Sequence, residues 1–137
     1  MAVLQGINTV LVVEDEALIA MDVEAALNEE GCRVLGPGAS VADAMALLDG
    51  ELPDCALLDI NLGIEKVFPV ADRLADAGVP FAFVTGYSAM NIPDRHRNRP
   101  LLLKPYLRET LLSVLLTLSE PPGPKDGPDA APACLMP

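Results

Sequence analysis

The sequence has little basic charge, and this scarcity excludes a class of function. Nine lysines and arginines stand against 20 aspartates and glutamates, which gives a formal net charge of −11. A domain that binds DNA or RNA needs a basic face to neutralise phosphates. The balance of charge therefore argues against a nucleic-acid partner for this domain.

Long hydrophobic runs and patterned cysteines are also missing. Hydrophobic residues make up 51% of the 137 positions, yet no uncharged apolar run approaches the roughly 18 residues that a membrane-spanning helix needs. The N-terminus lacks the basic segment and apolar core of a signal peptide, so we expect a cytoplasmic protein with no membrane partner. The three cysteines (Cys32, Cys55 and Cys134) are widely spaced and match no metal or redox motif.

What the sequence does contain is a series of short apolar runs separated by amphipathic stretches. Uncharged runs of this length, bounded by turn residues, are typical of strands buried on both faces of a sheet. Five runs are predicted as strands: 9–13, 32–35, 55–59, 81–84 and 101–103. Amphipathic spacing predicts helices that end at Gly31, Gly50 and Gly78, and a last helix over residues 107–118. The alternation predicts a three-layer (βα)5 α/β domain with a parallel sheet.

Local signals refine the segments between the strands. Ser40, with Asp43 three residues later, resembles a capping box at the start of the second helix. Pro69 fits the first turn of the third helix, where its missing N–H costs nothing. Residues 36–38 and 61–66 are predicted as loops.

Two parts of the chain carry little regular signal. Residues 87–99 are crowded with asparagine, proline and arginine and are predicted as a short, loosely held helix or a loop, in which His96 has no partner pattern. Residues 120–137 hold six of the 13 prolines and too little apolar content to offset the entropy of ordering. We therefore expect one domain over residues 1–119 and a disordered tail over residues 120–137.

Polar side chains stand at the carboxyl ends of four predicted strands. Glu14 and Asp15 follow the first strand, and Asp59 ends the third. Thr85 follows the fourth strand and Lys104 the fifth. Because all carboxyl ends of a parallel sheet lie on one edge, these side chains can converge on one site.

Each residue type at this edge suits phosphoryl transfer. Carboxylates such as Asp15 and Asp59 are the hard oxygen ligands that Mg²⁺ prefers, and a carboxylate can attack phosphorus to give an acyl phosphate. Lys104 offers a cation for a phosphoryl oxygen, and Thr85 offers a hydroxyl donor. The set predicts that Asp59 is the nucleophile. Glu16 is interpreted as solvated surface at a helix start, where acids are tolerated.

In their order and spacing, these motifs resemble the receiver domain of two-component response regulators. The resemblance covers roughly residues 8–118 and rests on four segments: residues 10–16, 57–59, 84–86 and 103–105. It implies a flavodoxin-like fold with sheet order 2-1-3-4-5. It also implies a bacterial phosphorelay protein that takes a phosphoryl group from a histidine kinase or a histidine phosphotransfer protein. Such a protein is an enzyme only in its own phosphorylation and slow dephosphorylation.

The resemblance also implies a role for each residue of the site. The implied roles are Asp59 as phosphoacceptor, Glu14 and Asp15 as the acidic pair that holds Mg²⁺, the backbone carbonyl of Asn61 as a further metal ligand, Thr85 as the switch hydroxyl, and Lys104 as the phosphate partner. A cis peptide bond between Lys104 and Pro105 is the habit of the family, and only a proline makes it common.

One position departs from the family pattern. Most members carry an aromatic residue three positions before the lysine, where this chain has Leu101. Residues 83–87 instead resemble the Phe-Ala-Thr-Gly-x-Tyr (FATGUY) subgroup, which implies a single-domain regulator paired with kinases of the HWE or related families. Since Gly86 adds backbone freedom, we hypothesise that phosphorylation orders residues 87–99 in place of the aromatic switch.

Two other classes of protein stay open at this point. An aspartyl-nucleophile phosphatase would need a second acid two residues after the nucleophile, and this position holds Asn61. A pseudo-receiver would be an adaptor that no longer accepts phosphate. For the receiver itself we expect action through protein contacts without a DNA-binding output, as a monomer or a weak dimer.

Overall fold

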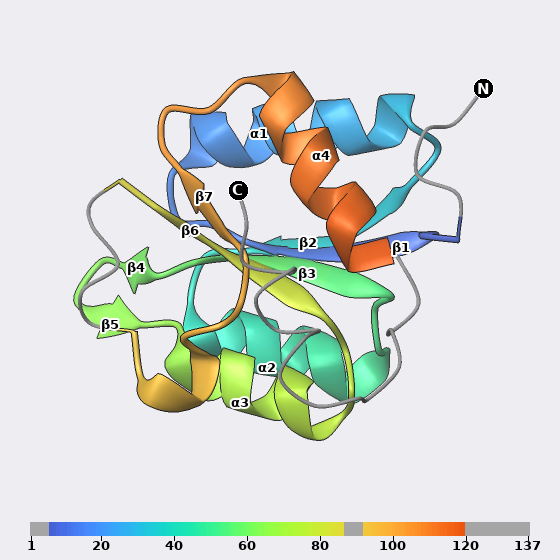
Figure 1. The fold of residues 1–137 in the computed structure, drawn as a ribbon. Helices are drawn as coiled ribbons and strands as arrows, with labels where there is room; N and C mark the ends of the chain where they lie inside the picture. The colour runs from blue at the N-terminus through green and yellow to red at the C-terminus, as the bar shows by residue number, and fades with distance from the viewer. Residues whose placement is uncertain (1–5, 87–91, 120–137) are drawn as a thin grey trace, which may run out of the picture.

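The computed structural model describes residues 6–86 and 92–119. Five parallel strands form one sheet in the order β2-β1-β3-β6-β7 (Figure 1). The strands are β1 (Thr9–Val13), β2 (Arg33–Gly38), β3 (Cys55–Asp59), β4 (Asn61–Leu62), β5 (Glu65–Lys66), β6 (Phe81–Thr85) and β7 (Leu101–Leu103). The helices are α1 (Ala17–Glu29), α2 (Val41–Gly50), α3 (Phe68–Asp76), the 3-10 helix η1 (Asp94–His96) and α4 (Arg108–Ser119).

The sheet lies between two layers of helices, with α1 and α4 on one face and α2 and α3 on the other (Figure 1). Because β4 and β5 form a separate hairpin, β6 and β7 are the fourth and fifth strands of the main sheet. The predicted flavodoxin-like order 2-1-3-4-5 is therefore confirmed. Among the described helices, none combines the length and the apolar composition that crossing a membrane requires.

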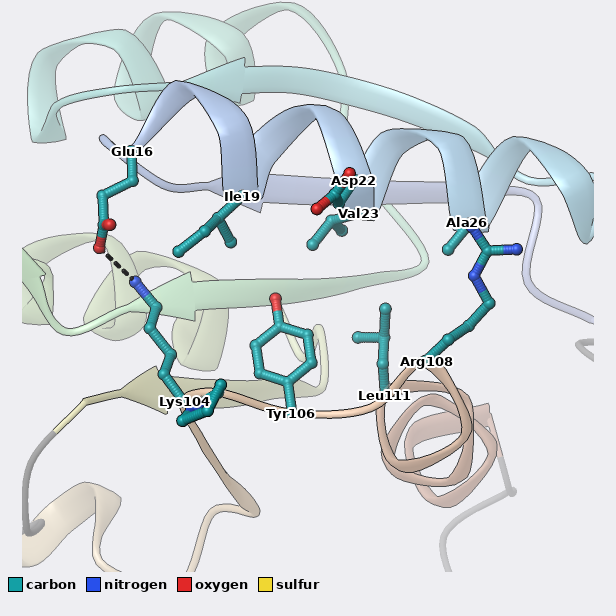
Figure 2. Close-up of a pocket in the computed structure, with 10 residues that line it drawn as sticks. Glu16, Ile19, Asp22, Val23, Ala26, Lys104, Tyr106, Arg108 and Leu111 are labelled. Atoms are coloured by element: carbon teal, nitrogen blue, oxygen red, sulfur yellow. Dashed lines mark hydrogen bonds and ion pairs between the residues drawn. The ribbon is translucent and has the colours of Figure 1, made fainter.

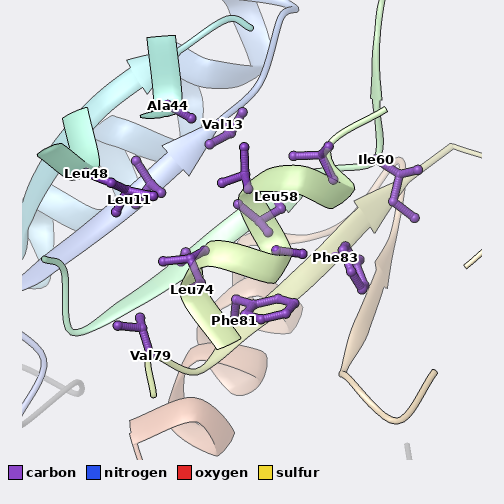
Figure 3. Packing of buried hydrophobic residues seen from close by; sticks show 14 of the residues in the cluster. Leu11, Val13, Ala44, Leu48, Leu58, Ile60, Leu74, Val79, Phe81 and Phe83 are labelled. Carbon is purple, nitrogen blue, oxygen red and sulfur yellow. The ribbon is translucent and has the colours of Figure 1, made fainter. Parts of the chain in front are cut away.

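Strand residues supply both halves of the core. Every residue of β1, β3 and β6 is buried. In β1, Val10 and Val12 pack with α1 and α4, whereas Leu11 and Val13 pack with α2 and α3. Figure 3 shows the half of the core that lies between the sheet and helices α2 and α3, where helix side chains cover Leu11, Leu58 and their neighbours. This burial on two faces explains why these strands are continuous apolar runs in the sequence.

Both local signals at helix starts are confirmed. The Oγ atom of Ser40 accepts a hydrogen bond from the backbone N–H of Asp43 at 3.0 Å. The carboxylate of Asp43 accepts in return from the backbone N–H of Ala39 at 3.1 Å, one residue earlier than in a standard capping box. Pro69 lies in the first turn of α3.

The two loops predicted at residues 36–38 and 61–66 are wrong. Residues 36–38 extend β2, and the backbone carbonyl of Gly38 accepts a hydrogen bond from Glu14 at 2.9 Å. Residues 61–66 form the β4–β5 hairpin, in which Gly63 takes the positive φ of 69° that its turn needs. Two-residue strands and a strand rich in glycine and proline leave no periodic pattern for sequence reasoning to detect.

The predicted short helix after β6 is present as η1, but it is not loosely held. His96 is 2% exposed and lies edge-on to the rings of Phe81 and Phe83, with centroids 5.6 and 6.0 Å apart. Its Nε2 atom lies 2.7 Å from Oδ1 of Asp72 on α3. Arg95 binds both carboxylate oxygens of Asp72 at 2.7 and 3.0 Å. The sequence shows no partner pattern for His96 because Asp72 lies 24 residues away.

The contacts of η1 with α3 also change the pKa of Asp72. Hydrogen bonds from Arg95, and secondarily from His96, lower the pKa of Asp72 to about 2.

The hypothesis that phosphorylation orders residues 87–99 includes residues 87–91, which lie outside the described residues. The predicted tail at residues 120–137 also lies outside them.

The first prediction concerns the anchor of η1. His96→Ala removes a buried ring from its contacts with Phe81 and Phe83, so the free energy of unfolding should fall by about 2–4 kcal/mol. Urea unfolding measures this change. Asn98→Ala, an exposed substitution two residues away, should alter stability by about 0.5 kcal/mol or less. Equal urea midpoints for the two variants would contradict the anchoring role of His96.

Candidate functional site

Four carboxylates gather at the carboxyl edge of the sheet. Glu14 and Asp15 follow β1, Glu16 precedes α1, and Asp59 ends β3. One oxygen of each side chain lies within 4.8 Å of the others. Glu14 and Asp59 are only 6% and 4% exposed, whereas Asp15 and Glu16 face solvent. The structure thus brings together the three acids that the sequence places at one edge, and adds Glu16.

Lys104 is the cation at the centre of this cluster. Its Nζ atom lies 3.0 Å from Oε1 of Glu14, 3.0 Å from Oε2 of Glu16 and 3.0 Å from Oδ2 of Asp59. An ammonium group has three N–H donors, so these three carboxylates can engage all of them. Burial lowers the pKa of Lys104, but the hydrogen bonds to the carboxylates outweigh burial and leave the pKa above its ordinary value.

The backbone fixes where Lys104 stands. β7 pairs with β6 through Thr85 and Leu103, and the N–H of Lys104 donates to the carbonyl of Thr85 at 2.8 Å. The peptide bond between Lys104 and Pro105 is cis, as the resemblance implies. The lysine therefore enters the site from the outermost strand of the sheet.

Glu14 has the most perturbed carboxyl group of the cluster. Burial, and secondarily the neighbouring Asp59, raise its pKa from 4.5 to about 7. The backbone N–H of Glu16, 3.1 Å from Oε2 of Glu14, and the ammonium of Lys104 act in the opposite direction. In the absence of a metal ion, this buried acid exchanges its proton near neutral pH.

Thr85 and Asn61 are close to Asp59 through backbone contacts. Thr85 is buried at the end of β6, one residue beyond Val84, which is paired with Asp59. The backbone N–H of Asn61 donates to Oδ1 of Asp59 at 3.2 Å. Lys66 on β5 donates to the side-chain oxygen of Asn61, so the hairpin helps to fix this residue, two positions after the acid. The ligand role of the Asn61 carbonyl stays a prediction.

Glu16 faces solvent at the start of α1, as predicted. Its carboxylate also accepts a hydrogen bond from Lys104, a contact that was not predicted. Glu16 occupies the N-cap position of α1 without a side-chain capping hydrogen bond, which leaves its carboxylate available. The sequence signal that could have found it is its place directly after two acids at a strand end, because every acid there is near the same edge.

A groove of about 600 Å³ begins at this cluster. It runs between α1 and the segment from Lys104 into α4, with Glu16 and Lys104 at one end and Arg108 at the other (Figure 2). Tyr106 lies along the groove, and burial raises the pKa of its phenol to about 12. The remaining lining residues are mostly apolar: Ile19, Asp22, Val23, Ala26, Pro105 and Leu111.

The fold and the site together define an α/β protein of the CheY-like class, with acids and a lysine at the carboxyl edge of a five-stranded parallel sheet. The sequence matches the family described as response regulator receiver domain over residues 10–115. The chain belongs to this family. The narrower FATGUY subgroup stays a prediction.

Related proteins agree with this assignment. The chain is 31% identical over 110 residues to the phyllosphere-induced regulator PhyR of Methylorubrum extorquens, covering 77% of this chain and 41% of PhyR. It is 28% identical over 110 residues to the transcriptional regulatory protein PdtaR of Mycobacterium tuberculosis, covering 77% of this chain and 54% of PdtaR. The chain therefore spans about half the length of the curated relatives it matches.

Solved structures extend the comparison. The solution structure of SdrG from Sphingomonas melonis Fr1 is 40% identical with a TM-score of 0.71, covering 82% of this chain and 98% of SdrG. The BeF3-activated conformation of SdrG, from Pseudomonas melonis Fr1, has the same identity and coverage and a TM-score of 0.67. These similarities support the fold over nearly the whole length of SdrG.

The second prediction concerns the pH dependence of stability without metal. Because the folded state raises the pKa of Glu14 from 4.5 to about 7, protonation favours folding. This contribution is complete below pH 4.5 and is lost as pH rises through 7. Unfolding free energies measured in a chelator should fall by up to about 3 kcal/mol over this window.

Glu14→Gln should flatten this pH dependence, since the amide does not ionise. Glu109→Gln, at an exposed position in the first turn of α4, is the matched control and should keep the slope of the unmodified protein. An unchanged slope in Glu14→Gln would contradict the assignment to this residue.

Proposed function

We propose that this chain is a phosphorelay receiver that accepts a phosphoryl group on Asp59 and acts through changed protein contacts. The observation that carries the proposal is the contact of Asp59, buried at the end of β3, with the ammonium of Lys104 in a cluster of acids. Phosphoryl transfer depends mainly on positioning and on neutralisation of charge. This site supplies a positioned carboxylate and a cation together.

The proposed reaction uses this chain's own side chains. A carboxylate oxygen of Asp59 attacks the phosphorus of a phosphohistidine on the donor protein. The new P–O bond forms as the P–N bond breaks, and the electron pair of the P–N bond stays on the imidazole. Lys104 pairs with a phosphoryl oxygen, and the hydroxyl of Thr85 donates to another. Water later attacks the same phosphorus, which restores the carboxylate and releases inorganic phosphate.

The donor set also fits Mg²⁺. The converging groups are carboxylates, hard oxygen ligands that suit this ion. We propose that Glu14, Asp15, Asp59 and the backbone carbonyl of Asn61 hold it. When bound, Mg²⁺ would neutralise part of the negative charge of the phosphoryl oxygens.

The related structures support this proposal. SdrG, 40% identical to this chain, has a BeF3-activated conformation, and trifluoroberyllate has the shape and charge of a phosphoryl group. By the FATGUY resemblance, we propose that the donor is a histidine kinase of the HWE or a related family, or a histidine phosphotransfer protein, in the bacterial cytoplasm. A phosphatase is less well supported, because Asn61 cannot protonate a leaving group.

The surface beside the site suits a protein donor. A donor must bring its histidine to Asp59, and the groove in Figure 2 opens beside Lys104, which contacts that acid. On α1, Leu18 and Met21 are 77% and 63% exposed and lie three residues apart on one face. Exposed apolar side chains of this size are typical of protein contacts.

The third prediction tests the phosphoacceptor. The unmodified protein, incubated with Mg²⁺ and a small phosphodonor such as phosphoramidate, should gain one phosphoryl group in intact mass. The adduct should be stable in acid and labile in base, as expected for an acyl phosphate. Asp59→Asn should lose the adduct, and Asp76→Asn, an exposed substitution at the end of α3, should keep it.

Three other outcomes would contradict this proposal in different ways. No adduct on the unmodified protein would favour the pseudo-receiver adaptor. Rapid release of phosphate over many turnovers would favour the phosphatase. An adduct that persists in Asp59→Asn would move the phosphoacceptor to another residue.

A further inference from the structure

Glu16 has a relation to Lys104 that the roles implied for the family do not include. All three N–H donors of the ammonium face carboxylates, each at 3.0 Å, from Glu14, Glu16 and Asp59. A phosphoryl group that approaches Asp59 while this residue is still a carboxylate needs one of these donors for its own oxygens. One of the present partners must therefore release Lys104.

The three partners differ in how readily they can do so. The side chains of Glu14 and Asp59 are each 5% exposed and stand at the ends of buried strands. The side chain of Glu16 is 60% exposed. An exposed carboxylate that loses its contact with a lysine is hydrated by water instead. A buried carboxylate that loses this contact remains an unpaired charge in the interior, which costs much more free energy. Glu16 is thus the partner that Lys104 can lose at the lowest cost.

The backbone around Glu16 permits this release. Its N–H donates to Oε2 of Glu14 at 3.1 Å, and its carbonyl accepts from Ala20 in the first turn of α1. Its side chain makes no capping hydrogen bond. The contact with Lys104, drawn as a dashed line in Figure 2, can therefore break without loss of the helix start.

We propose that Glu16 is a positioning residue that occupies Lys104 in the unphosphorylated site and competes with the phosphoryl group for it. The proposal rests on the proposed function, because it concerns the same transfer to Asp59. Glu16 holds the ammonium over the acceptor before transfer and swings into solvent when the phosphoryl oxygen takes its place. Its removal therefore makes the phosphorylated form easier to reach.

Two substitutions separate direct competition from simple repulsion of the incoming anion. Glu16→Asp keeps the negative charge but is one methylene shorter, so it loses its reach to Lys104. Glu16→Gln keeps the length but removes the charge and with it most of the attraction. Competition for Lys104 predicts the same direction of change in both variants, whereas repulsion alone predicts a change only in Glu16→Gln.

The experiment measures the affinity of trifluoroberyllate, in the presence of Mg²⁺, by NMR titration. Both variants should bind the mimic about threefold to fivefold more tightly, the range that an exposed ion pair accounts for. Glu51→Gln is the matched control, since it removes a surface carboxylate from an ion pair with Arg33, and it should bind as the unmodified protein does.

A second readout needs neither metal nor mimic. In a chelator, labelling of the Lys104 amine by acetic anhydride should be faster in both Glu16 variants than in the unmodified protein or in Glu51→Gln. Peptide mass spectrometry measures the rate at this one lysine. Urea unfolding of each variant accompanies both measurements, because an aspartate at the N-cap position can itself stabilise α1.

The outcomes separate the two proposals. Failure of the unmodified protein to bind trifluoroberyllate would overturn the proposed function. Normal binding by the unmodified protein, with unchanged affinity and labelling in Glu16→Asp, would overturn the role of Glu16 alone. Tighter binding in Glu16→Gln but not in Glu16→Asp would reduce Glu16 to a source of repulsion.

Discussion

The ammonium of Lys104 is the interaction on which the site depends. Two carboxylates, Glu14 and Asp59, are buried side by side at the sheet edge, and a buried charge without a partner costs several kcal/mol. Lys104 contacts both. It reaches them only because β7 pairs with β6, which places a residue 90 positions from Glu14 against it. The acidic cluster is therefore a product of the complete sheet, and no local segment forms it alone.

The same topology explains why the site can be rigid and still open to a donor. Helices cover both faces of the sheet, so the apolar residues of β1, β3 and β6 are committed to the core. Only the residues at the carboxyl edge are released from that packing. On this edge the polar groups stand on strand ends, which hold them more firmly than loops would. The groove toward α4 then gives access from the side of α1 (Figure 2).

Sequence reasoning predicted the segments whose residue pattern is set by burial in the sheet. It failed for contacts between residues that are distant in sequence. The continuous apolar runs of β1, β3 and β6 identified buried strands, and their polar ends identified Asp59 and Lys104. The hairpin at residues 61–66 was missed because its strands are too short for any period. His96 was missed because its partners on α3 and β6 are distant in sequence. The contact of Glu16 with Lys104 was missed because local rules favour an acid at a helix start for reasons unrelated to Lys104.

Leu101 stands where most members of the receiver family carry an aromatic residue. Leu101 is paired with Phe83 in the sheet and packs against the core on the side of α2 and α3, so no aromatic ring is available at this position to turn inward. Two rings of β6, Phe81 and Phe83, lie edge-on to the buried ring of His96. The strand that ends in Thr85 is thus packed directly on η1, and η1 is bonded to α3. Because β6 carries both Thr85 and the two rings that contact His96, the strand that supplies a polar residue to the site also holds η1 in place.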